Sequence, residues 1–128
     1  MLLTEYLSGL TGSISEYAKT GLILSSELTV DSRTDKIGLI KGAVVFLNGS
    51  KLFFTEYLDL RYKTRKLSYV FHYQDNNSNM IFRYDNATHR PALPFADHKH
   101  SGKDVIQAPV PGLPAVLEEI IELLMLSS

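Results

Sequence analysis

The feature that most constrains this fold is a series of strand-like runs joined by short polar turns. In the first run, apolar and polar side chains alternate, which is typical of a strand with one buried face. Short connections join antiparallel neighbours, so the runs predict a five-stranded antiparallel meander. The runs cover residues 22–31, 37–47, 52–60, 67–75 and 80–86.

Helical patterns flank these runs. Residues 1–20 place leucines at helical spacing, and residues 113–126 carry a broad apolar stripe opposite glutamates, with Pro114 in the first turn. Residues 87–112 are rich in proline and histidine and are expected to form an irregular loop. The sequence therefore predicts one α+β domain over residues 1–128, with sheet over 22–86 and both helices packed on one sheet face.

Composition narrows the class of protein. There is no cysteine, which excludes disulfides and thiol nucleophiles and suits a reducing compartment. The first residues lack the basic segment of a signal peptide, and no apolar stretch has membrane-spanning length. We therefore expect a cytoplasmic protein without a membrane segment.

The net charge of −1 hides an uneven distribution. Residues 61–103 contain eight lysines and arginines against three aspartates, a net charge of +5. All four histidines lie in the same span. A basic, histidine-rich segment indicates a place where phosphate groups could bind.

A hairpin around residues 76–79 would set the fourth run against the fifth, with His72 opposite Arg83. In the same register Tyr73 faces Phe82, Phe71 faces Tyr84, and Val70 faces Asp85. Glu56 is a carboxylate on an otherwise apolar strand face, where an unpaired charge is costly. If the preceding connection is centred near Lys63, Glu56 lies beside Val70 and diagonal to His72. The predicted row is Glu56, His72 and Arg83.

This row has two interpretations. It is either a structural ion pair that bridges the sheet, or a set of acid–base groups beside an anion-binding arginine. Metal-independent ribonucleases use the second arrangement, because one group accepts the 2′-hydroxyl proton, another protonates the leaving oxygen, and a cation stabilises the phosphorane.

The segment after residue 86 offers further candidates. His98 and His100 have a spacing that chelates metal in an extended chain, with His89 or Asp97 as third ligand. Solvated loop histidines are the alternative, and we expect no metal and no cofactor. Lys99 and Arg90 are candidates for phosphate contact or simply for solubility. Aromatic side chains that either stack on bases or belong to the core are Tyr69, Tyr73 and Tyr84.

Four blocks give the chain a family resemblance: 72-HYQD-75, 81-IFRYDNATH-89, 95-FADHKH-100 and 114-PAVLEEI-120. Their order and spacing resemble the TumE-like family of bacterial toxins over residues 20–120. Family members usually have NAPHHP where this chain has Arg90, and FPHHKH where it has Ala96 and Asp97. The pattern is retained at His72, Tyr73, Arg83, Tyr84, Asp85, Asn86, His89, Pro91, His98, Lys99 and His100.

The resemblance implies the toxin component of a toxin–antitoxin pair, encoded beside an antitoxin with a helix-turn-helix domain. Our leading hypothesis is an enzyme that cleaves RNA without metal. Its catalytic residues would be His72, Arg83, Asp85, His89 and Glu56. Its substrate-binding residues would be Tyr73, Tyr84, Asn86, His98, Lys99 and His100.

Three alternatives remain at this stage. The chain is instead a non-catalytic module that sequesters a protein or nucleic acid, or the histidine-rich loop is the docking site of the antitoxin. The apolar helix 113–126 is also a candidate interface for a homodimer or partner.

Overall fold

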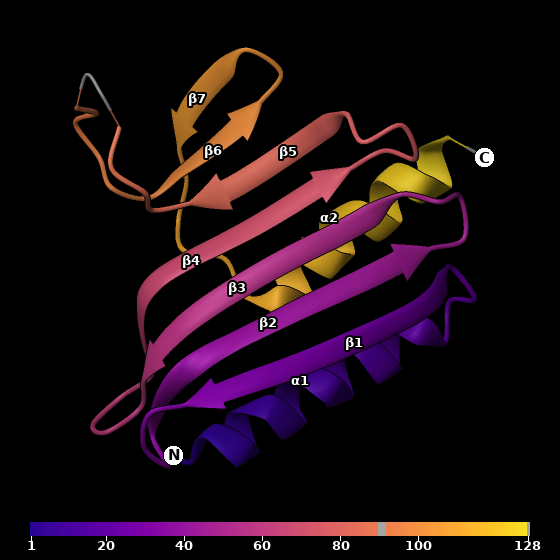
Figure 1. Cartoon of the computed structure of the whole chain (residues 1–128). Helices are drawn as coiled ribbons and strands as arrows, with labels where there is room; N and C mark the ends of the chain where they lie inside the picture. Colours follow the sequence, from indigo (N-terminus) through magenta and orange to yellow (C-terminus); the bar gives the residue numbers. More distant parts are fainter. Residues whose placement is uncertain (90–91, 128) are drawn as a thin grey trace.

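The computed structural model describes residues 1–89 and 92–127. Within these residues, seven strands form one antiparallel sheet in sequential order, and a helix lies at each end of the chain (Figure 1). The elements are α1 (Leu3–Ala18), β1 (Ile23–Ser32), β2 (Ile37–Phe46), β3 (Lys51–Asp59), β4 (Arg65–Gln74), β5 (Met80–Asp85), β6 (His98–Ser101), β7 (Asp104–Gln107) and α2 (Leu113–Leu126).

The α+β class, the antiparallel meander and the two terminal helices are confirmed, but the prediction of five strands is wrong. Strands β6 and β7 lie inside the segment 87–112, which was expected to be irregular. Each has only four residues, HKHS and DVIQ, and β6 contains no apolar side chain. Strands this short lack the hydrophobic alternation by which strands are recognised in a sequence.

Both helices lie behind the same face of the sheet (Figure 1). Apolar side chains of alternate strand residues meet α1 and α2 there in one core, and fully burying each such side chain stabilises the fold by about 1.5–3 kcal/mol. Neither helix of the described residues has the length and apolarity that crossing a bilayer requires. Core residues with at most 1% exposure include Ile40, Val44, Leu52, Leu58, Phe71, Val116, Leu117 and Ile120.

Strands β2 and β3 are in close contact on the helix-covered face of the sheet. Gly42 pairs directly with Phe54, and a Cβ atom at Gly42 would overlap the phenyl ring. The ring of Phe54 stacks on that of Phe71 in β4, with centroids 5.5 Å apart. The aromatic layer beneath the helices therefore depends on a strand position without a side chain, and the opposite face of the sheet is left open for the groups described next.

Candidate functional site

The candidate site lies on the sheet face opposite the helices, where β4, β5 and β6 run side by side. Arg83 of β5 pairs with His72 of β4 on one side and with His100 of β6 on the other. Asp85, two residues further along β5, pairs with His98. Because successive side chains of a strand point to opposite faces, Arg83 and Asp85 share one face, and so do His98 and His100. The predicted register between β4 and β5 is confirmed.

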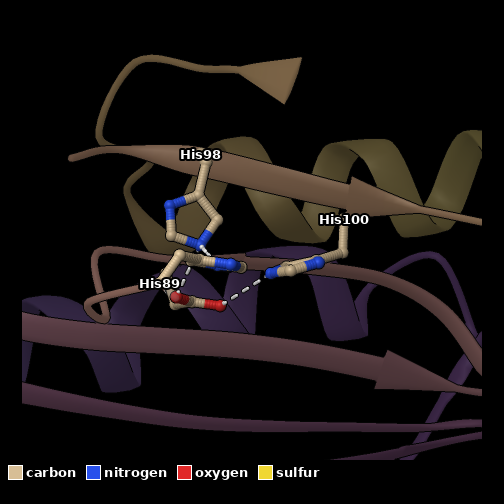
Figure 2. Close-up of side chains that lie close together, drawn as sticks. His89, His98 and His100 are labelled. Atoms are coloured by element: carbon tan, nitrogen blue, oxygen red, sulfur yellow. Dashed lines mark hydrogen bonds and ion pairs between the residues drawn. The ribbon is translucent and has the colours of Figure 1, made fainter. Parts of the chain in front are cut away.

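Three histidines and one aspartate form a cluster at the end of β5. Asp85, His89, His98 and His100 each offer one nitrogen or oxygen atom, and these four atoms all lie within 4.8 Å of one another. Figure 2 shows the three imidazoles pointing toward one another and toward a carboxylate. We call these four residues the histidine cluster. It brings together chain segments up to 15 residues apart in sequence.

Asp85 is the anchor of the histidine cluster. It is 2% exposed, and its two oxygens are held by separate donors. The backbone amide of Ala87 donates to Oδ1 at 2.9 Å, and Nε of Arg83 donates to Oδ2 at 3.1 Å. His98 Nε2 lies 2.9 Å from Oδ1, and His100 Nε2 lies 3.6 Å from Oδ2. The carboxylate is therefore fixed in position and faces two imidazoles.

His98 is completely buried and has neighbours at both ring nitrogens. Its Nδ1 lies 2.8 Å from the carbonyl oxygen of Ala96, and its Nε2 lies 2.9 Å from Nε2 of His89 as well as near Asp85. A carbonyl oxygen only accepts hydrogen bonds, so Nδ1 carries the proton. Burial lowers the pKa of His100 below its ordinary value, although the nearby Asp85 carboxylate acts in the opposite direction. The lowered pKa favours a neutral imidazole at His100.

A second group of side chains continues across the open face from the histidine cluster. Phe53 of β3, His72 of β4, Arg83 of β5 and His100 of β6 are successive cross-strand partners. The Phe53 side chain is 41% exposed, whereas its neighbour Phe54 is in the core. Among the described residues, Nδ1 of His72 is buried without a hydrogen-bond partner, while its Nε2 lies 3.2 Å from Gln74 Oε1. We call Phe53, His72, Arg83 and His100 the open-face row.

Glu56 does not belong to this row, so its predicted position is wrong. It pairs with Tyr69 and not with Val70, because the register between β3 and β4 differs by one residue from the prediction. A shift of one residue moves a side chain to the other sheet face. Glu56 is instead fully buried beneath the helices, where its Oε2 lies 2.7 Å from Nζ of Lys66.

Other residues predicted to bind substrate also lie away from the cluster. Lys99 and Tyr84 are cross-strand partners on the helix-covered face, and both contact Glu119 of α2, at 2.7 Å and 2.6 Å. Tyr73 is 1% exposed and donates to Ser50 Oγ. Asn86 closes the end of the sheet, since its side chain accepts from the amide of Tyr69 and donates to the carbonyl of Leu67. The structure therefore gives these four residues contacts within the fold.

The loop candidates divide in the same way. Asp97, one of the two candidate third ligands beside His98 and His100, accepts a hydrogen bond from Tyr69 at 2.9 Å and is not in the cluster. The carboxylate beside His98 and His100 is that of Asp85, and not that of Asp97. Arg90 and Pro91 lie outside the described residues. The sequence interpretation missed the pairing of Asp85 with His98, and only recognition of β6 would have revealed it.

Comparison with known proteins identifies the family of this chain. The family model described as Toxin TumE matches residues 14–125, which include the whole sheet, the histidine cluster, nearly all of α2 and the last part of α1. No curated protein and no solved structure matches the chain significantly. The match covers far more than half of the chain, and the protein therefore belongs to the TumE toxin family.

Proposed function

We propose that this toxin cleaves RNA and that the histidine cluster and the open-face row form its catalytic surface. One observation carries the proposal: Arg83 lies between His72 on one side and His100 of the cluster on the other. Cleavage of an RNA phosphodiester needs a proton acceptor and a proton donor on either side of a phosphate, with a cation at the phosphate itself. The order of residue types across β4, β5 and β6 matches this requirement.

Arg83 is suited to hold the phosphate. Its Nε donates to Asp85, which fixes the plane of the guanidinium. Within residues 1–89 and 92–127, its two terminal nitrogens have no hydrogen-bond partner, and the side chain is 39% exposed. A guanidinium presents its paired N–H groups to two oxygens of one phosphate, so the free edge of Arg83 supports phosphate recognition.

The proton transfers are assigned to groups on either side of Arg83. The cluster accepts the proton of the attacking hydroxyl, through His89 or through water that it holds. His72 donates the proton to the leaving oxygen. Asp85 takes the orienting role, because it contacts His98 at 2.9 Å, whereas Glu56 lies on the opposite face. Phe53 extends the row with an exposed ring on which a base can stack, an interaction worth about 1–3 kcal/mol per base.

The partner completes the proposal. A toxin family implies an antitoxin, and we propose that the antitoxin carries a helix-turn-helix DNA-binding domain and is encoded in the adjacent gene. Inspection of the neighbouring reading frame tests this directly. An adjacent gene without any such domain would reject this part of the proposal and leave the assignment of the catalytic surface untouched.

The activity is tested with the purified full chain and a fluorescent single-stranded RNA, beside DNA of the same sequence and with or without a chelator. We expect cleavage of RNA and not of DNA. Arg83→Ala should lower the rate by about 10²–10³-fold, the usual cost of removing one stabilising donor. Arg33→Ala is the matched control, since Arg33 is an exposed arginine in the turn after β1. A wild-type chain that binds RNA without cleaving it, under any metal condition, would replace catalysis by sequestration.

A further inference from the structure

The geometry of the histidine cluster points to more than acid–base chemistry. We propose that Asp85, His89, His98 and His100 form a binding site for one divalent transition-metal ion of the zinc class. The proposal concerns metal binding itself, and it does not require the chain to cleave RNA.

The first argument is distance. Zinc binds imidazole nitrogen and carboxylate oxygen at about 2.0–2.2 Å, so ligand atoms at the corners of a tetrahedron lie about 3.3–3.6 Å apart. The separations within the cluster are 2.9 Å from His98 Nε2 to Asp85 Oδ1, 2.9 Å from His98 Nε2 to His89 Nε2, and 3.6 Å from His100 Nε2 to Asp85 Oδ2. All four candidate atoms lie within 4.8 Å of one another. Small side-chain rotations convert this spacing into a four-ligand site.

The second argument is the lone pairs. His98 uses its Nδ1 proton to donate to the carbonyl of Ala96, so in the neutral ring Nε2 carries a lone pair. That lone pair faces both the Asp85 carboxylate and His89 Nε2, each at 2.9 Å. A proton on Nε2 of His98 can point to Asp85 or to His89, but not to both. A cation at the centre of the cluster accepts the lone pairs of His98, His89 and His100 and also binds the Asp85 carboxylate.

The third argument is the surrounding support. Histidines that bind metals almost always donate their second ring N–H to a carbonyl or carboxylate, which fixes the tautomer and the ring orientation. His98 does so through Ala96. Asp85 is held in turn by the amide of Ala87 and by Arg83. A buried pair of ligands with this hydrogen bonding is a preorganised half of a metal site.

The donor set selects the class of metal. Three imidazoles and one carboxylate suit zinc and other borderline transition metals, whereas calcium and magnesium require mostly oxygen ligands. Asp85 and His98 are buried, but His89 and His100 are only half-buried, which leaves one side of the cluster accessible to water. A zinc ion there would lower the pKa of a bound water toward about 7 and supply the proton acceptor proposed above.

The test uses the untagged full chain, because a histidine tag binds zinc itself. The protein is stripped with chelator, desalted and titrated with zinc sulfate against a chromophoric competitor. We expect one ion per chain, a rise in melting temperature on binding, and an X-ray absorption shell of nitrogen and oxygen at about 2.0–2.1 Å. His98→Gln should weaken binding by at least about 100-fold. His100→Gln, which changes a half-buried residue, should weaken it by at least about 10-fold, with folding checked by circular dichroism.

His72→Gln is the matched control, because His72 lies on the same face but outside the cluster, and it should bind zinc like the wild type. Absence of binding by the wild type, or equal loss in the His72 and His100 variants, would overturn the proposal. Zinc binding without RNA cleavage keeps the metal site and rejects the ribonuclease. RNA cleavage by a wild type that binds no zinc rejects the metal site and keeps the ribonuclease.

Discussion

Glu56 of β3 and Lys66 of β4 form an ion pair beneath the helices, with 2.7 Å between Oε2 and Nζ. Tyr6 of α1 donates to both oxygens of Glu56, and Lys66 donates to the carbonyl of Pro111, just before α2. Burial, reinforced by Glu56, raises the pKa of Tyr6 far above its ordinary value, so the hydroxyl remains a donor. This buried pair connects the sheet to both helices and leaves the open face free for function.

Replacement of Lys66 by methionine should therefore destabilise the fold strongly. It leaves the Glu56 carboxylate buried without its cation, which costs about 3–5 kcal/mol of unfolding free energy. Urea unfolding measures the loss. The double variant Glu56→Gln/Lys66→Met should recover most of it, and Lys63→Met, in an exposed turn, should stay within about 0.5 kcal/mol. A double variant no more stable than the single one would contradict the ion-pair interpretation.

Gly42→Ala should also destabilise the chain, by about 1–3 kcal/mol, because the new methyl group overlaps the ring of Phe54. Gly12→Ala is its matched control. Gly12 lies within α1, where an added Cβ meets nothing within 4 Å, so alanine should stabilise the helix by about 0.5–1 kcal/mol. Thermal unfolding of the two variants should thus shift in opposite directions. Shifts of the same sign would show that the β2–β3 packing is looser than described.

Lys99→Met should lower stability and leave RNA cleavage unchanged. Lys99 and Tyr84 share the Glu119 carboxylate of α2, and loss of such a charged hydrogen bond in a partly exposed place costs about 1–2 kcal/mol. Urea unfolding and the cleavage assay are run on the same preparation. If cleavage falls as far as in Arg83→Ala while stability is retained, Lys99 contacts the substrate and its assignment to the helix face is wrong.

The contact between Asp59 and Arg61, in the connection between β3 and β4, can be tested by its pH dependence. The side chain and amide of Arg61 hydrogen-bond to it and lower its pKa to about 2. A carboxyl with a lowered pKa stabilises the folded state above its ordinary pKa near 3.8, and this contribution is lost as pH falls toward 2. The difference in unfolding free energy between wild type and Asp59→Asn should be constant near neutral pH and shrink below about pH 4. A difference that stays constant between about pH 4 and about pH 2 would contradict the contact between Asp59 and Arg61.

The sequence predicted those parts of the site that depend on strong local signals. An asparagine-rich turn between two aromatic strands was enough to pair His72 with Arg83, since the hairpin leaves few registers. The apolar stripe of residues 113–126 likewise predicted α2 and its buried face. In both cases local turn chemistry and hydrophobic pattern agree with the final packing.

Other parts depended on tertiary contacts that a single sequence does not display. A β-bulge between Tyr57 and Leu58 changes the β3–β4 register, and no sequence signal placed it there. Strand β6 is entirely polar, because its residues face the cluster on one side and Glu119 on the other. The same strand explains why His98 and His100 point to the open face while Lys99 between them points to α2.

Growth arrest in cells that produce the chain without its antitoxin tests the role of the open face most directly. The wild type is compared with Arg83→Ala/His89→Ala, at equal levels of folded protein, and with Arg33→Ala as the control. If the open face is the toxic site, the double variant should allow normal growth while the control arrests it as the wild type does. Arrest by the double variant at the wild-type rate would remove the histidine cluster and Arg83 from the toxic mechanism.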